Sequence, residues 1–140
     1  MAQMAISKAK SPEVKKLAET IIKDQTLEIK EMQTWYKQWY GTAVPTSSMN
    51  MMNNQMGQSM MTSVQQQDRM NDSMMSTLKN ATNFDQEFLR QMIRHHQSAV
   101  MMAGMVVNSA VHPEIRNLAQ SIIKNQNAEI SQMRQLLHNA

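Results

Sequence analysis

The residues best suited to chemistry lie in one stretch, 92–105, which holds two adjacent histidines and four methionines. Imidazole and thioether groups are both ligands for soft or borderline metal ions, and neither becomes charged when it binds. The candidate ligands of this stretch are His95, His96, Met92, Met101, Met102 and Met105. Their spacing fits a Met/His site for Cu(I), and it equally fits a core helix in which methionine fills space.

These candidate ligands need a helix to position them, and the stretch contains no Pro and one Gly, at Gly104. At 100° per residue, Met92 and His96 fall on the apolar face that we expect to be the core side. His95, Met102 and Met105 share the flank of that face, because residues three, four and seven apart stack on a helix. The alternative for His96 is a hydrogen bond inside the core.

A second group of candidate ligands lies in a middle segment rich in Gln, Asn and Met. At helical pitch its apolar residues form one stripe, so we predict a long amphipathic helix over 49–81. The candidate ligands of this helix are Met49, Met52, Met56 and Met60. Core packing is again the alternative, but the chain has 17 Met and 7 Leu. Ordinary cores prefer leucine, so the methionine excess needs a reason beyond packing.

The chain contains an internal repeat. A shift of 101 positions aligns residues 1–35 with residues 102–136 without a gap and with fifteen identities. Met1 and Met4 match Met102 and Met105, so they are candidate ligands too. The first copy starts abruptly, without a counterpart of the two histidines. We therefore expect Met1 to be an internal residue of a longer precursor from which a matching half-helix was trimmed.

Both copies of the repeat carry a polar pair inside an apolar helical stripe. The two pairs are Gln25 and Glu28, and Gln126 and Glu129. A polar pair on a buried face must find partners. Glu129 accepting a hydrogen bond from His96 or His95 would fix the orientation of a ligand imidazole. A buried network that only sets the helix register is the alternative.

Capping residues give the helix boundaries. Ser11-Pro12-Glu13 and His112-Pro113-Glu114 are helix starts, and Thr82-Asn83 is a third. Gly41 ends the first long helix. We predict helices from 12 to 40, 84 to 110 and 113 to 138. The expected fold is all-α: one domain, 1–140, forming an antiparallel four-helix bundle of the ferritin-like kind with a truncated N-terminal half-helix. Repeat one spans 1–40, the middle helix 49–81 and repeat two 84–138.

Composition excludes several classes of protein. The chain has no Cys, which excludes disulfides and thiolate sites. Its net charge of +3 comes without a basic block interleaved with aromatics, so we expect no nucleic-acid partner. No apolar run reaches membrane-spanning length, and no signal peptide is present. The Glu-x-x-His motif of di-iron sites and the common catalytic motifs are missing, which argues against an enzyme.

A long signature resembles the DUF305 family of secreted bacterial domains. It reads Phe88…Met92-Ile93-x-His95-His96-x-x-Ala99-x-x-Met102-Ala103, then Pro113-Glu114-Ile115-Arg116-x-Leu118-Ala119-x-x-Ile122-Ile123-x-x-Gln126-x-x-Glu129-Ile130-x-x-Met133. The resemblance implies a ferritin-like bundle and a periplasmic or secreted metallochaperone or buffer that binds Cu(I) and Ag(I) in copper resistance. A copper-exporting or copper-receiving protein is the implied partner. The implied ligands are His95, His96, Met92, Met102 and Met105, with Met1 and Met4 as first-repeat counterparts.

Three alternatives stay open. The histidines can also bind Cu(II). The chain can instead be a Met-rich helical interaction module without specific metal binding, because methionine surfaces adapt to varied partners. The half-helix at the N-terminus would leave an apolar groove, which favours a homodimer. The missing first His-His pair is the one departure from the family pattern.

Overall fold

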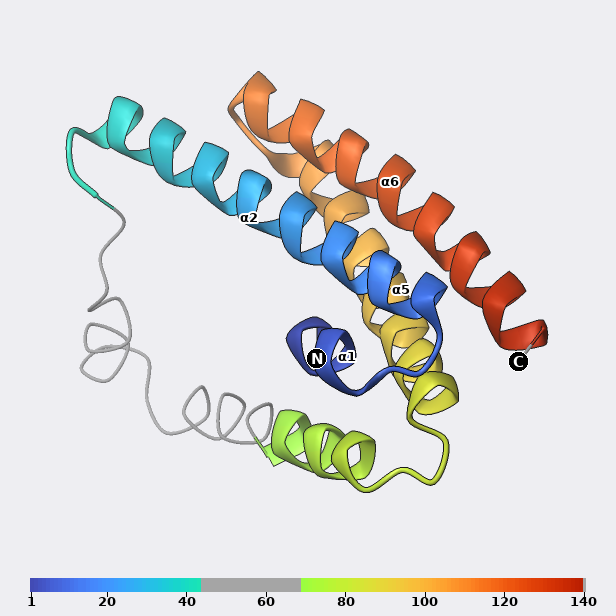
Figure 1. The fold of residues 1–140 in the computed structure, drawn as a ribbon. Coiled ribbons are helices and arrows are strands. Elements are labelled where there is room, and N and C mark those ends of the chain that lie inside the picture. Colours follow the sequence, from blue (N-terminus) through green and yellow to red (C-terminus); the bar gives the residue numbers. More distant parts are fainter. Residues whose placement is uncertain (44–68, 140) are drawn as a thin grey trace. The chain divides into compact units, whose positions relative to one another are not determined.

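The computed structural model describes residues 1–43 and 69–139, and all the regular structure in these ranges is helical (Figure 1). The elements are α1 (Ala2–Lys8), α2 (Pro12–Tyr40), α5 (Phe84–Ser109) and α6 (Pro113–His138), and residues 69–79 are also helical. The prediction of an all-α fold is confirmed for these residues. Most of the predicted middle helix, with Met49, Met52, Met56 and Met60, lies outside the described residues.

The helices begin and end where the capping residues predict. Pro12 is the first residue of α2, and the amide of Val14 donates to the Ser11 hydroxyl at 3.4 Å. Gly41 ends α2 with a φ of 74°, a left-handed conformation that glycine adopts without steric cost. The Asn83 side chain accepts a hydrogen bond from the amide of Gln86 and so caps α5.

The described chain forms two compact units, and the first consists of Met1–Glu28 with Ala81–Ala140. In this unit α5 and α6 run antiparallel, joined by a turn at residues 110–112 (Figure 1). The core takes one apolar stripe from each helix, as amphipathic helices require. Its buried residues include Val14, Leu17 and Ile21 of α2, Phe88, Leu89 and Met92 of α5, and Ile130 and Met133 of α6.

The second unit, Ile29–Asn80, includes the last turns of α2. All four Trp and Tyr residues of the chain lie in these turns and form two ring pairs. Trp35 stacks on Trp39 with ring centroids 6.2 Å apart, and Tyr36 lies 4.7 Å from Tyr40. Residues four apart meet on one helix face, so each pair follows from the sequence spacing.

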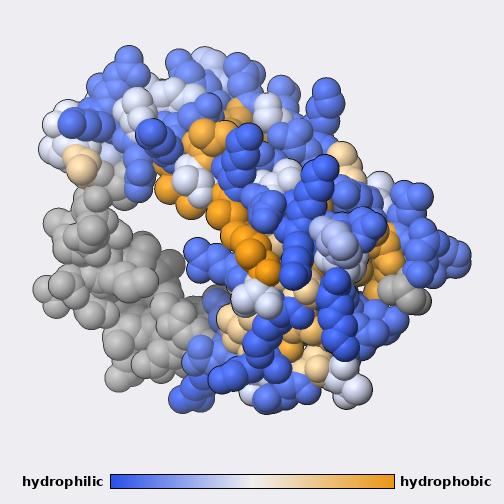
Figure 2. All heavy atoms as spheres, in the orientation of Figure 1, coloured by the Kyte–Doolittle hydropathy of each residue, from blue (hydrophilic) through white to orange (hydrophobic). Residues whose placement is uncertain are grey.

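Most of the surface in Figure 2 is hydrophilic, with hydrophobic residues gathered in a band. None of the helices in the described ranges has the length and apolar character that a membrane crossing requires.

Candidate metal centre

Helix α5 carries the predicted ligands of repeat two on two different faces. Two of them belong to the core, where Met92 is 5% exposed and His96 is 3% exposed. The others lie at the surface: His95, and the methionines Met101 (71% exposed), Met102 (57%) and Met105 (61%). Space-filling in the core therefore explains Met92, but it does not explain the three surface methionines.

We call Met101, Met102 and Met105 the α5 methionine cluster. Met105 lies three residues after Met102 and four after Met101, and at these spacings helical side chains are neighbours about 5–6 Å apart at Cβ. Because methionine has three rotatable bonds, two or three of these thioether sulfurs can turn toward one ion. His95 lies seven residues before Met102, which is about 10 Å along the helix axis. The cluster can thus act alone or with an imidazole two turns away.

The buried histidine has a different environment. Its ring Nε2 lies 2.5 Å from Oε2 of Glu129 on α6, whose side chain is 14% exposed. An ionised carboxylate can only accept, so Nε2 of His96 is the donor. The sequence left open which histidine Glu129 would reach, and the structure shows that it is His96.

The polar pairs of both repeats meet His96 at one small cavity of about 10 Å³, the space of a single water molecule. Besides Ile21 and His96, the residues that line it are Asp24, Gln25 and Glu28 from α2 and their counterparts Asn125, Gln126 and Glu129 from α6. Within the described chain, the buried Oε1 atom of Gln126 has no hydrogen-bond partner. The predicted polar residues therefore share one site, built by two helices of the repeat around one imidazole.

This polar cavity is not a cage for a hard metal ion. In residues 1–43 and 69–139, His, Asp and Glu side chains form no group of three or more that could hold a metal. Thioethers and single imidazoles are groups that suit soft ions.

Of the first-repeat candidates, Met4 lies on α1, a helix of seven residues, and Met1 directly precedes it. Met1 and Met4 are half-buried there, whereas their counterparts on α5 are exposed. The two repeats thus give equivalent methionines different exposure, and the α5 methionine cluster is the more accessible of the two sets.

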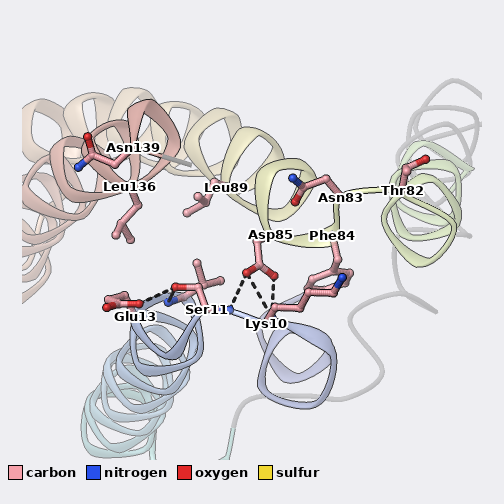
Figure 3. A pocket seen from close by; sticks show the side chains of 11 residues that line it. Lys10, Ser11, Glu13, Thr82, Asn83, Phe84, Asp85, Leu89, Leu136 and Asn139 are labelled. Atoms are coloured by element: carbon pink, nitrogen blue, oxygen red, sulfur yellow. Dashed lines mark hydrogen bonds between the residues drawn. The ribbon is translucent and has the colours of Figure 1, made fainter.

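A hollow of about 900 Å³ lies at the N-terminal ends of α2 and α5 (Figure 3). Among the described residues that line it, there is no methionine or histidine. The Asp85 carboxylate points into this corner and accepts hydrogen bonds from the amides of Lys10 (3.0 and 3.2 Å) and Ser11 (2.7 Å). These are free amides at the start of α2, so Asp85 acts as a cap supplied by another helix.

Sequence reasoning missed two kinds of residue. Met32 and Met70 are 39% and 55% exposed and so are further accessible thioethers. The high methionine count of the chain was the signal that could have pointed to these two residues. Asp24 and Asn125 line the cavity at His96 and occupy equivalent positions of the repeat, 101 residues apart. The repeat alignment could have found them as a pair even though the two residues differ.

Comparison with known proteins agrees with the signature of the sequence. The family model called Domain of unknown function (DUF305) matches residues 1–137. The chain belongs to the DUF305 family. An uncharacterized protein, L153, of Acanthamoeba polyphaga mimivirus is 40% identical to this DUF305 chain over 53 residues. That match spans 38% of this chain and 35% of the viral protein.

Solved structures of CopM are similar to this DUF305 chain over nearly its whole length. CopM in the Cu(II)-bound form is 43% identical with a TM-score of 0.72, over 99% of this chain and 84% of that one. The Cu(I)-bound form is 44% identical with a TM-score of 0.73, over 99% and 83%. An Ag-bound form obtained by co-crystallization is 43% identical with a TM-score of 0.73, over 99% and 82%.

Proposed function

We propose that this DUF305 chain binds Cu(I), and Ag(I) as its mimic, through methionine and histidine side chains. The observation that carries the proposal is the exposure of the α5 methionine cluster, 57–71% for each side chain. Methionine in a core needs no ligand role, but three adjacent exposed thioethers give the surface no packing advantage. The similarity to CopM, of which copper-bound and silver-bound structures are known, supports the same cargo.

The proposed role is that of a periplasmic or secreted metallochaperone or buffer, not an enzyme. Thioethers are neutral and bind more weakly than thiolates, which suits release of copper to an exporting or receiving protein. Cu(II) is a second cargo, with the exposed His95 as its first ligand because imidazole suits Cu(II). Further soft-metal ligands are proposed on the first repeat and the middle segment: Met1, Met4, Met49, Met52, Met56 and Met60.

Met92, His96 and the residues around the His96 ring take a supporting part in this proposal. Met92 and His96 hold α5 in the core, and Gln25, Glu28, Gln126 and Glu129 form the polar surroundings of His96. In finer detail we propose an antiparallel four-helix bundle, with the middle segment as one helix, and a homodimer as its assembly. The similarity to CopM over 99% of the chain is what supports a common fold.

A second candidate function is a protein-interaction module. The exposed face of α5 continues into Val106 and Val111, which are 36% and 86% exposed and are not metal ligands. An apolar surface of this kind also fits a partner protein. Metal affinity separates the two functions, because only the first requires that a few thioethers bind an ion at defined equivalents.

The test is a titration of the purified chain with Ag(I), followed on methionine methyl and histidine ring NMR signals. Metal binding predicts saturable shifts at the α5 methionine cluster within the first equivalents, with small shifts at the buried Met92 and Met133. Shifts that spread evenly over all methionines without a plateau would mean non-specific thioether binding and would favour the interaction module. A parallel titration with Zn(II), which thioethers bind poorly, serves as the control.

A further inference from the structure

A row of lysines runs along the outer side of α2. Lys16, Lys23, Lys30 and Lys37 follow one another at intervals of seven residues, and all four are exposed. Seven residues make nearly two helical turns, so neighbouring lysines are about 10 Å apart along the axis and turned by about 20°, and all four fall within about 60°. The row lies opposite the buried stripe of Val14, Leu17 and Ile21. We call it the α2 lysine row.

Most acidic residues of α2 lie on other sides of the helix than the lysine row. The helix has five lysines and five acidic residues, so its formal charge cancels. At helical pitch only Glu19 shares the side of the lysine row, and the other acidic residues, Glu13, Asp24, Glu28 and Glu31, fall on other sides. No ion pair in the described part of the chain involves a lysine of the row. With four lysines and Glu19, this side of the helix keeps a formal charge of about +3.

The second copy of the repeat is an internal control, because it shows which residues a helix of this repeat needs for packing. Helix α6 keeps the apolar stripe of α2, with Leu118 and Ile122 in place of Leu17 and Ile21. It does not keep the row. The counterparts of Lys16 and Lys30 are Asn117 and Ser131, and Lys23 has a lysine counterpart, Lys124. Past the end of the alignment, His138 follows Lys37 by the same 101 residues. A helix of this repeat therefore packs without the lysines, and the row needs another explanation.

The surface at the C-terminal end of the row is hollowed. Lys30 and Lys37, with Gln33, Thr34 and Ala43, line a space of about 360 Å³ that is open to solvent. Two ammonium groups and an amide donor thus surround a space with room for a phosphate group. Phosphate oxygens accept hydrogen bonds from all of these groups.

We propose that the α2 lysine row docks this protein on an anionic phospholipid bilayer, with headgroup phosphates along the row and one in the hollow at Lys30 and Lys37. Four aligned lysines on one helix are the charge pattern that binds anionic membrane surfaces. Protein interfaces are depleted in lysine and anchored by aromatic or Arg residues, and the row has neither anchor. The proposal is independent of copper binding.

The experiment measures binding of the full chain to sedimented vesicles, either of phosphatidylcholine alone or with 30% phosphatidylglycerol. The test variant is K16Q/K23Q/K30Q/K37Q. The matched control is K8Q/K79Q/K124Q/R134Q, which removes four exposed basic residues outside the row and changes the net charge equally. Glutamine has nearly the same helix propensity as lysine, and circular dichroism checks that each variant is folded. A milder variant, K30Q/K37Q, tests the hollow if the quadruple variant fails to fold.

We expect the wild-type chain to bind only the anionic vesicles, and more weakly as salt increases. Each lysine of the row contributes about a fivefold gain in partitioning, so the test variant should lose at least about a hundredfold and K30Q/K37Q about twentyfold. The control variant should lose less than about fivefold. Equal losses in the test and control variants would overturn the proposal, as would no binding at physiological salt. Tighter binding to duplex DNA, to an acidic peptide or to inorganic phosphate than to the vesicles would overturn it as well.

Discussion

The Nε2 atom of His96 on α5 lies 2.5 Å from the Oε2 atom of Glu129 on α6, and this contact joins two helices inside the core. The next residue along the chain, His95, is exposed to solvent. Adjacent histidines on a helix point about 100° apart, so one can serve packing while the other stays accessible. The two histidines of the motif therefore have different physical tasks.

Substitution of Glu129 by Ala should destabilise the fold. It leaves the buried Nε2 donor of His96 without an acceptor, which costs about 1–3 kcal/mol of unfolding free energy. Urea unfolding followed by circular dichroism measures the change. Glu19→Ala, on the exposed side of α2, is the control and should change the free energy by less than about 0.5 kcal/mol. Equal unfolding midpoints for wild type and Glu129→Ala would contradict the role of this contact.

A double-mutant cycle sharpens this prediction. His96→Leu and Glu129→Leu each leave one polar group unpaired, whereas the double variant removes both. The double variant should therefore be destabilised by less than the sum of the single changes, by about 1 kcal/mol or more. Simple addition of the two effects would mean that the residues do not interact.

The double substitution M102L/M105L should lower the Ag(I) or Cu(I) stoichiometry while it leaves helicity nearly intact. Leucine keeps the apolar side chain and removes the sulfur, and both positions are more than half exposed. Surface changes of this kind alter stability by less than about 0.5 kcal/mol. Competition with a Cu(I) chelator of known affinity measures the stoichiometry.

The control for that prediction is M92L/M133L, which removes two sulfurs from the core. These positions are 5% and 0% exposed, so the change should cost up to about 1.5 kcal/mol per site and leave the metal stoichiometry unchanged. If the buried pair lowers the stoichiometry and the exposed pair does not, the site lies in the core and our assignment is wrong.

Asp85→Ala should loosen the start of α2. The Asp85 carboxylate accepts from the amides of Lys10 and Ser11, and loss of a cap of this kind costs about 0.5–2 kcal/mol. Hydrogen exchange at these two amides, measured by NMR, should be faster in the variant. Asp72→Ala, at an exposed position of the helical residues 69–79, is the control and should leave exchange at both amides unchanged. Unaltered exchange in Asp85→Ala would exclude the capping role.

Sequence signals that act within a helical turn predicted the helices well. They did not predict contacts between residues far apart in the chain. Pro12 and Gly41 gave the bounds of α2 because their backbone preferences act within a turn of the helix. The apolar period placed Met92 and His96 in the core for the same reason. The Asp85 cap was not predictable, because it joins residues about 75 positions apart and no spacing rule reports such a contact.

The candidate site was predicted in part. Helical pitch placed His95, Met102 and Met105 together on the flank of α5, and the structure finds each of them exposed. The sequence could not decide which histidine contacts Glu129. The answer depends on how α6 packs on α5, and the pattern of a single helix carries no information about that packing. Metal binding by the exposed thioethers stays a prediction, which the Ag(I) titration tests.

The pH dependence of one carboxyl group can be predicted from its hydrogen bond. The Ser11 hydroxyl donates to Oε2 of Glu13 at 2.7 Å and, with a backbone hydrogen bond, lowers the pKa of Glu13 below its ordinary value of 4.5. A lowered pKa in the folded state means that Glu13 stabilises the fold above the unfolded-state pKa. This stabilisation is lost as the pH falls through the folded-state pKa.

Ser11→Ala should therefore raise the pKa of Glu13 toward 4.5. It should also remove the contribution of the Ser11 hydroxyl to the pH dependence of the unfolding free energy. Carboxyl ¹³C shifts followed from pH 7 to pH 2 measure the pKa directly. Ser7→Ala removes another exposed hydroxyl, one that donates to the Met4 carbonyl, and should leave the pKa of Glu13 unchanged. A Glu13 pKa that is the same in wild type and Ser11→Ala would show that the hydroxyl does not stabilise the charged carboxylate in solution.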